Sequence, residues 1–139
     1  MAGNVYDTKG IYPPHPLDSL IAQVKQCVSN VRDVLSQGYQ EAIYQKALLI
    51  ELQDAGLKAE AEVPLQVHYK GILLGDFLAD IVVEDKLILE IKAVQMVSAA
   101  HELQLVNYLK ASGLEIGILI NFGQHPVFFK RKFRDYIYK

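Results

Sequence analysis

The sequence predicts an α/β fold in which a mixed β-sheet is flanked by helices. Apolar residues recur every three or four positions from Leu17 to Leu35, which is the spacing of an amphipathic helix. From Leu57 to Tyr69 apolar and polar residues alternate, which is typical of a half-buried strand. The later run from Leu114 to Phe122 is mostly apolar, as expected of a central strand. Two helices, then strands, then a helix between further strands indicate a mixed sheet with helices on its faces.

Glycines, a proline and polar turns separate the predicted elements. Gly56 and Gly113 can end the second and third helices, because glycine readily adopts the left-handed conformation found at helix C-termini. Pro64 implies that the first strand lies at a sheet edge or is interrupted. Residues 1–16 lack periodicity and are predicted to be a flexible leader, whereas 17–139 should form a single domain. The predicted helices are 17–35, 39–55 and 99–112, and the predicted strands are 57–69, 72–83, 87–93, 114–122 and 127–132.

Composition narrows the class of protein. With 139 residues, 51% of them hydrophobic, the chain can build one real core. A formal net charge of -2 argues against coating nucleic acid through bulk charge, although a local patch could bind it. The single Cys27 excludes an internal disulfide and a cysteine-based zinc site, and its place on an apolar helical stripe predicts a small core residue. Without a membrane-length apolar run or a signal peptide, the expected location is intracellular, either cytoplasmic or nuclear, with no membrane partner.

Three ionisable residues interrupt the apolar strands at 72–83 and 87–93. If these strands pair through the polar turn at 84–86, Asp80 lies opposite or diagonal to Glu90. Two carboxylates that close repel unless a proton or a cation lies between them, and Mg²⁺ prefers such oxygen ligands. Lys92 shares a face with Glu90 and would point at a phosphate or a metal-bound water. The combination predicts metal-assisted hydrolysis of a phosphodiester.

Each of these patterns also has a purely structural explanation. Lys92 could simply neutralise Glu90 on a solvated sheet face. Glu41 lies near the start of the second predicted helix, where an acidic residue is favourable in any protein. His101, Gln104 and Tyr108 form a polar stripe on the third helix, which could equally be a satisfied polar edge of the core.

Several segments occur together in an order that points to a known family. They are Gly38-x-x-Glu41-x-x-Tyr44, Val63-Pro64-Leu65, Tyr69-Lys70-Gly71, Ala79-Asp80, Glu90-Ile91-Lys92-Ala93, His101-x-x-Gln104-Leu105-x-x-Tyr108-Leu109 and Leu119-Ile120-Asn121-Phe122-Gly123. Over residues 18–131 the chain resembles the GxxExxY proteins, a branch of the PD-(D/E)XK nuclease superfamily. The resemblance implies a restriction-endonuclease-like core within the mixed sheet.

The resemblance also implies a metal site. Asp80 and Glu90 would bind Mg²⁺, for which Mn²⁺ should substitute, and the carbonyl of Ile91 would be a further ligand. Glu41, from the second helix, would complete the metal shell. Ala79 stands where the proline of the superfamily's name is often found, a departure that the family tolerates.

Three further residues have catalytic roles in the resemblance. Lys92 would assist the attacking water. Gln104 and Tyr108 match a Gln-x-x-x-Tyr helix motif of exonuclease-type members, in which these residues help to hold the lysine and the phosphate.

The expected function is therefore a Mg²⁺-dependent nuclease that hydrolyses phosphodiester bonds in DNA by metal-activated water. The alternative is a catalytically silent nucleic-acid or protein-interaction module that retains the nuclease fold. Retention of Asp80, Glu90, Lys92 and Gln104 favours the enzyme, because a binding module has no need of all four. A chain of this size is expected to need a partner protein or a second copy, as a homodimer, to select its substrate. Endonuclease or exonuclease action, and DNA or RNA preference, stay open.

Basic and aromatic residues are interleaved near the C-terminus. The cations could contact phosphates and the rings could stack on bases. The interpretation that we favour is a last strand with exposed charges, followed by a tail that docks its tyrosines. The residues concerned are Phe128, Phe129, Lys130, Arg131, Lys132, Phe133, Arg134, Tyr136 and Tyr138.

Overall fold

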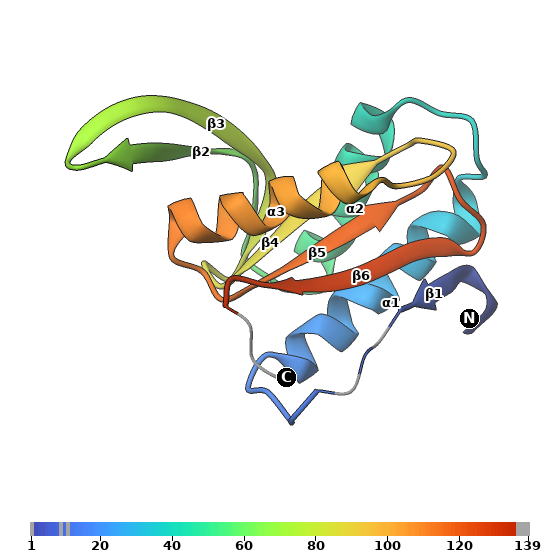
Figure 1. The fold of residues 1–139 in the computed structure, drawn as a ribbon. Coiled ribbons are helices and arrows are strands. Elements are labelled where there is room, and N and C mark those ends of the chain that lie inside the picture. Colours follow the sequence, from blue (N-terminus) through green and yellow to red (C-terminus); the bar gives the residue numbers. More distant parts are fainter. Residues whose placement is uncertain (1, 9, 11, 136–139) are drawn as a thin grey trace.

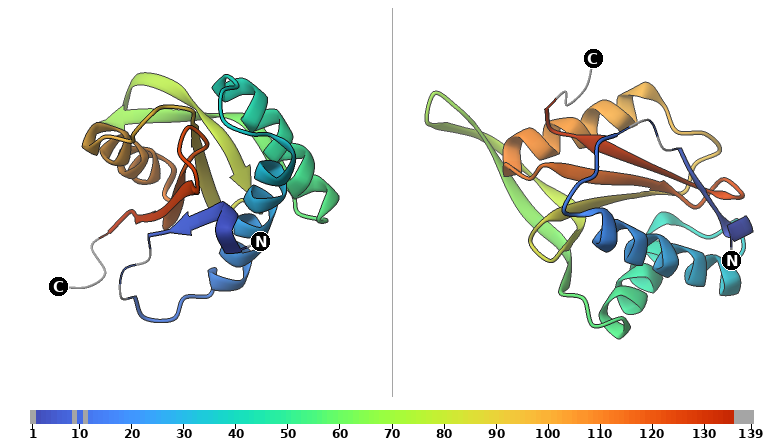
Figure 2. Two further views of the ribbon diagram at one scale, coloured as in Figure 1. Left: turned by 90° about the vertical axis from the view of Figure 1, so that its right-hand side faces the viewer. Right: turned by 90° about the horizontal axis from the view of Figure 1, so that it is seen from below.

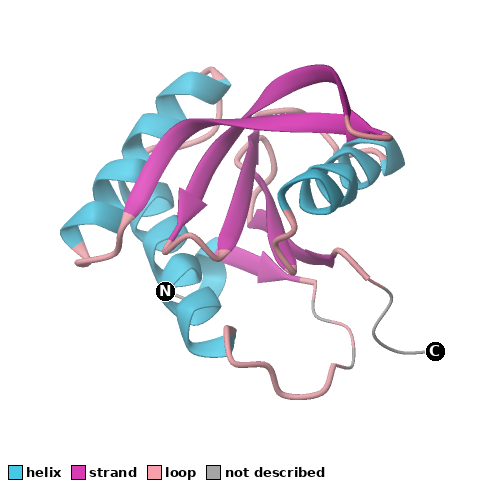
Figure 3. Ribbon diagram, turned by 90° about the vertical axis from the view of Figure 1, so that its left-hand side faces the viewer, coloured by secondary structure: helices cyan, strands magenta, loops and turns pink. Residues whose placement is uncertain are grey.

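A six-stranded mixed sheet forms the centre of the molecule, with α1 and α2 on one face and α3 on the other (Figures 1 and 3). The computed structural model describes residues 2–8, 10 and 12–135. The elements are η1 (Ala2–Asn4), β1 (Val5–Asp7), α1 (Asp18–Val34), α2 (Glu41–Asp54), β2 (Ala59–Tyr69), β3 (Ile72–Val83), β4 (Leu87–Lys92), α3 (Ala99–Ser112), β5 (Ile116–Asn121) and β6 (Val127–Phe133). The strand order is β1-β6-β5-β4-β3-β2, in which β4 is parallel to β5 and β1 is parallel to β6.

The predicted mixed α/β class is confirmed, and the arrangement is consistent with a restriction-endonuclease-like fold. The strand β1 is an addition to the predicted order, because it lies within residues 1–16, which were expected to form a leader without a strand. It pairs with the exposed edge of β6, from Val5 with Val127 to Asp7 with Phe129. A strand of three residues is too short to leave a periodic signal in the sequence.

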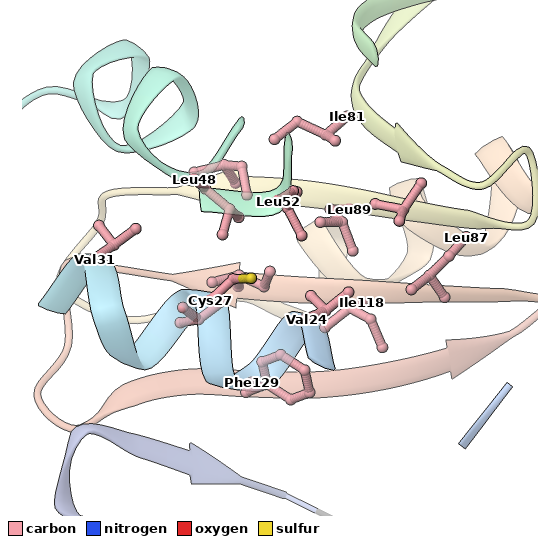
Figure 4. Packing of buried hydrophobic residues seen from close by; sticks show 14 of the residues in the cluster. Val24, Cys27, Val31, Leu48, Leu52, Ile81, Leu87, Leu89, Ile118 and Phe129 are labelled. Carbon is pink, nitrogen blue, oxygen red and sulfur yellow. The ribbon is translucent and has the colours of Figure 1, made fainter. Parts of the chain in front are cut away.

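The larger apolar cluster lies between the sheet and the helices α1 and α2 (Figure 4). Val24 of α1 and Leu48 of α2 are fully buried there against Leu89 of β4 and Ile118 of β5. Cys27 is 3% exposed in the same cluster, which confirms that it is a small core residue. The apolar faces that the sequence periodicity predicts for the helices and strands therefore pack against each other in one layer.

The helix α3 covers the opposite face over a smaller apolar cluster. Its start is fixed by a capping box, in which the Ser98 hydroxyl accepts from the His101 backbone N–H and the His101 ring accepts from the Ser98 backbone N–H. Gly113, with a φ of 78°, ends the helix in the left-handed conformation, as predicted. Leu105 packs directly over Gly117 of β5, where a Cβ would lie 2.7 Å from a leucine methyl carbon.

The strands β2 and β3 form a long ribbon that extends beyond the rest of the sheet (Figures 1 and 2). Ile81, Val82 and Val83 of β3 pair with β4, whereas β3 pairs with β2 along most of its length. The strand β2, which contains Pro64, is one of the two edge strands of the sheet, and an edge position was one of the two outcomes that the proline predicted. The projecting part of the ribbon carries its apolar side chains largely exposed, as at Ile72.

Gly123, just after β5, is required by a close approach of two backbone segments. A Cβ at this position would overlap the backbone of Val94 and lie 2.6 Å from its nitrogen. We expect Gly123→Ala to lower the free energy of unfolding by about 1–3 kcal/mol in urea denaturation, because the backbones must separate to admit it. Gly75→Ala is the matched control, since its Cβ would meet open space. Equal stabilities of the two variants would contradict the close approach.

Candidate active site

The strands β3 and β4 separate at a carboxylate. Their antiparallel ladder ends at the pair Ile81–Leu89, and one further step in the same register places Asp80 opposite Glu90. The backbone nitrogen of Ile91 donates to Asp80 Oδ2 at 2.8 Å. The Asp80 side chain thus takes the place of a ladder partner and binds the strand that carries Glu90.

The irregular backbone of β2 accompanies this separation. Glu62 has a φ of 53°, a left-handed conformation that is uncommon in a strand, and the β2–β3 pairing skips Glu62 and resumes at Val63 with Ala79. Gln45 of α2 donates from Nε2 to the carbonyl oxygen of Asp80 at 3.0 Å. The ribbon and α2 together hold Asp80 at the point where the sheet divides.

The carboxyl groups of Asp80 and Glu90 share a proton. Burial, followed by the Asp80 charge and a hydrogen bond to Asp80, raises the pKa of Glu90 to about 9, and its side chain is only 4% exposed. Burial also raises the pKa of Asp80, although the Ile91 N–H and the Glu90 hydrogen bond favour its ionised form. Near neutral pH Glu90 therefore keeps its proton, and its hydrogen bond helps to offset the cost of placing Asp80 beside it.

Lys92 lies within electrostatic reach of three carboxyl groups. Its ammonium group acts to lower the pKa values of Asp80, Glu90 and Glu41, in each case against the effect of burial. Lys92 is the last residue of β4 and pairs in register with Asn121 of β5. A cation in this position can stabilise negative charge that develops on a bound group.

The loop before α2 is built to present Glu41. Gly38 has a φ of 112°, which favours glycine. The Tyr44 hydroxyl donates to the Ser36 carbonyl at 2.6 Å and accepts from the Tyr39 backbone N–H at 3.2 Å. Tyr44 is fully buried, so the glycine and the tyrosine of the Gly38-x-x-Glu41-x-x-Tyr44 motif fix the loop, and Glu41 is left at the first turn of the helix.

Glu41 itself faces the site from the α2 side of the sheet. Its side chain is solvent-accessible, yet burial by its surroundings is the main cause that raises its pKa. Lys92 and His101 lower that pKa and Asp80 raises it, so Glu41 shares its electrostatic environment with β3, β4 and the start of α3.

Tyr108 and Gln104 approach from the opposite face on α3. The pKa of Tyr108 is raised by burial and then by the charges of Glu90 and Asp80, which places its hydroxyl in the field of the carboxyl pair. Gln104 is exposed one turn earlier and lines a groove together with Tyr108. The structure thus brings Tyr108 to the carboxyl pair, whereas Gln104 lies on the wall of the adjoining groove.

Residues outside the sequence-predicted set also shape the site. Gln45 and Glu62 contact or influence Asp80, but on the sequence they look like ordinary surface residues of a helix and a strand. The fully buried Asn121 accepts from the Val94 and Gly123 backbone nitrogens, both at 3.0 Å, and donates to the Val94 carbonyl. The sequence signals for Asn121 were its place at the end of an apolar strand and its presence in the segment Leu119-Ile120-Asn121-Phe122-Gly123, but neither assigned it a role.

The basic residues of β6 are engaged in ion pairs. Lys130 and Lys132 each contact Glu102 of α3 at 2.9 Å, and Arg131 contacts Asp18 of α1 at 2.8 Å. These contacts support the structural interpretation of the basic and aromatic segment. Tyr136 and Tyr138, which were expected to dock as part of a tail, lie outside the described residues.

The donor chemistry of the carboxyl pair fits a hard divalent cation. Two carboxyl groups that share a proton can exchange that proton for a cation and retain the same oxygen donors. Among the described residues, no three His, Cys, Asp or Glu side chains are grouped to hold a metal ion. Asp80 and Glu90 would then be the main protein ligands, with water or phosphate supplying the others, as Mg²⁺ commonly accepts. The ligand roles of Glu41 and the Ile91 carbonyl stay predictions.

The comparisons with known proteins agree with this geometry. A family model described as the PD-(D/E)XK nuclease superfamily matches residues 18–133. Neither the curated proteins nor the solved structures contain a match to the chain. In the described part of the chain, no helix has the length and apolar character that crossing a membrane requires.

The shared proton predicts an unusual dependence of stability on pH. Glu90 has a pKa of about 9 in the folded protein against 4.5 as its ordinary value, so between these pH values the folded state holds a proton that the unfolded state has lost. The Glu90 contribution to the free energy of unfolding therefore falls as pH rises, by up to about 1.4 kcal/mol per pH unit. Glu90→Gln cannot ionise and should gain stability relative to the wild type from pH 5 to pH 8.5.

Urea denaturation in EDTA measures this difference, because the chelator removes divalent cations. Glu60→Gln, which changes an exposed carboxylate on the neighbouring ribbon, is the matched control and should follow the wild type. Parallel pH profiles for the wild type and Glu90→Gln would show that Glu90 is ionised in the folded protein.

Proposed function

The chain belongs to the PD-(D/E)XK nuclease superfamily, and from this premise we propose that it is a Mg²⁺-dependent nuclease that hydrolyses phosphodiester bonds in DNA. The observation that carries the proposal is the position of two carboxyl groups, half-buried Asp80 and buried Glu90, next to each other where β3 and β4 separate, with Lys92 two residues beyond Glu90 on the same strand. A purely structural sheet has no need to place two acids side by side away from full solvent exposure. Within the superfamily, the Gly38-x-x-Glu41-x-x-Tyr44 motif supports assignment to the GxxExxY branch.

The proposed roles follow from what each side chain can do at its position. Asp80 and Glu90 would hold the divalent cation, either Mg²⁺ or Mn²⁺. When bound, such an ion polarises a phosphate oxygen and lowers the pKa of a coordinated water. Lys92 stabilises the negative charge that develops on the phosphate and orients the attacking water.

Residues of α2 and α3 flank the carboxyl pair and would contact the substrate or its water. Glu41 is placed to accept a hydrogen bond from water, or to contribute a further oxygen ligand, from the α2 side. Tyr108 can donate its hydroxyl hydrogen to a phosphate oxygen from the α3 side, and Gln104 can contact the same strand of substrate. We further propose that a partner protein or a second copy of the chain contributes to substrate selection.

Lys92→Ala should abolish most cleavage and leave the fold intact. Removal of a charge partner of the transition state typically lowers the rate by about 100-fold or more. The assay is incubation of labelled linear, circular and single-stranded DNA with Mg²⁺, Mn²⁺ or EDTA. Lys86→Ala, at the opposite end of β4, is the matched control and should cleave like the wild type. Wild-type activity in Lys92→Ala would reduce Lys92 to a salt-bridge partner, and DNA binding without cleavage by the wild type would identify a silent module.

Metal binding can be tested separately from cleavage. Calorimetry with Mn²⁺ should detect binding to the wild type that Asp80→Asn loses, because the substitution removes one of the two carboxylates yet can still accept from the Ile91 N–H. Asp76→Asn, on the exposed part of the same strand, is the matched control and should bind like the wild type. Unchanged Mn²⁺ affinity in Asp80→Asn would remove Asp80 from the ligand set.

A further inference from the structure

A groove of about 720 Å³ lies between α3 and the projecting β2–β3 ribbon, which arches beside the helix in Figure 1. Phe77 of β3 stacks on Tyr108 of α3 with ring centroids 3.8 Å apart and an interplanar angle of 18°. This aromatic pair joins the ribbon to the helix within the groove. Phe77 lies three residues before Asp80 on β3, so the groove adjoins the part of the strand that carries the carboxyl pair.

The charge of the groove differs from that of the chain. Among the described residues that line it, His68 and Lys110 have basic side chains and none has a carboxyl group. The chain as a whole has a formal net charge of -2. A lining with basic side chains and no carboxyl group favours an anionic ligand. The phosphate backbone of a nucleic-acid strand is such a ligand.

The remaining side chains of the groove match the chemistry of exposed bases. Gln66, Gln104 and Asn107 each offer amide donors and an amide acceptor, which can pair with base edges. Leu103 is 61% exposed and adds an apolar surface on which a base can rest. A volume within the roughly 300–1,000 Å³ range of small-molecule pockets admits a few nucleotides and not a duplex. Base faces and edges are accessible in this way only in an unpaired strand.

We propose that this groove binds an unpaired segment of DNA and leads it to the carboxyl pair, so that the substrate is single-stranded DNA or a single-stranded end joined to a duplex. The cleavage part of this inference rests on the proposed nuclease function, whereas the binding part does not. Lys110 and His68 contact phosphates, and the amides with Leu103 contact bases. The projecting ribbon is then one wall of the substrate channel.

Fluorescence anisotropy in EDTA tests binding without cleavage. The probes are a labelled oligodeoxynucleotide of about 16 nucleotides and the same strand annealed to its complement. We expect the wild type to bind the single strand more tightly than the duplex. Lys110→Ala should make the negative slope of log K against log salt about 0.7 less steep for the single strand, because one phosphate contact is lost. Leu103→Glu should weaken single-strand binding roughly tenfold, since it places a carboxylate where a base would rest.

Two control variants lie on α2, on the opposite face of the sheet. Lys46→Ala removes an exposed cation, and Ile50→Glu places a carboxylate at a residue that is 56% exposed. Both should bind the single strand like the wild type. Equal affinity of the wild type for duplex and single strand, or groove variants that bind like the controls, would overturn the proposal.

The outcomes also separate this inference from the proposed nuclease function. If the groove variants lose single-strand binding but the wild type cleaves nothing with Mg²⁺ or Mn²⁺, the groove assignment stands and the nuclease assignment fails. If the wild type cleaves DNA while the groove variants bind and cleave single strands as it does, the nuclease assignment stands and the groove assignment fails.

Discussion

The carboxyl groups of half-buried Asp80 and buried Glu90 lie against each other where β3 separates from β4, and the rest of the site is arranged around this unfavourable contact. Desolvation of an unpaired charge is expensive, so the pair must keep a proton or gain a cation. The backbone N–H of Ile91 compensates Asp80, and Lys92 offsets part of the negative charge. The apolar clusters on both faces of the sheet supply the stability that permits such a contact.

The topology explains why groups from both sides of the sheet reach this pair. The parallel strands β4 and β5 are connected through α3, so α3 begins near the end of β4 that carries Lys92. The helix α2 lies on the opposite face and begins at Glu41, which interacts electrostatically with Lys92 and with His101 at the start of α3. The two helix starts therefore flank one edge of the sheet. Crevices at the carboxyl ends of parallel strands are common ligand sites in α/β proteins for the same geometric reason.

Local patterns in the sequence were sufficient for the three α-helices and for the strands β2 to β6, but only in part for the site. The polar turn at 84–86 fixed the β3–β4 hairpin, and alternation along each strand placed Asp80 and Glu90 on one face. No local pattern could indicate that Glu62 adopts a left-handed conformation or that Gln45 binds the Asp80 carbonyl, because both depend on segments distant in the chain. The short β1 depends in the same way on the edge that β6 offers.

The positions of the basic side chains limit where a nucleic-acid strand can bind. The most basic segment of the sequence, in β6, is directed at partners within the fold: Lys130 and Lys132 bind Glu102, and Arg131 binds Asp18. Those ion pairs also connect α1 and α3 to the sheet. If the basic side chains bound nucleic acid instead, these contacts between helix and sheet would be lost. Recognition of nucleic acid by a chain of net charge -2 must therefore depend on a local surface. The groove beside α3, lined by Lys110 and adjoining the carboxyl pair, is where the structure offers one.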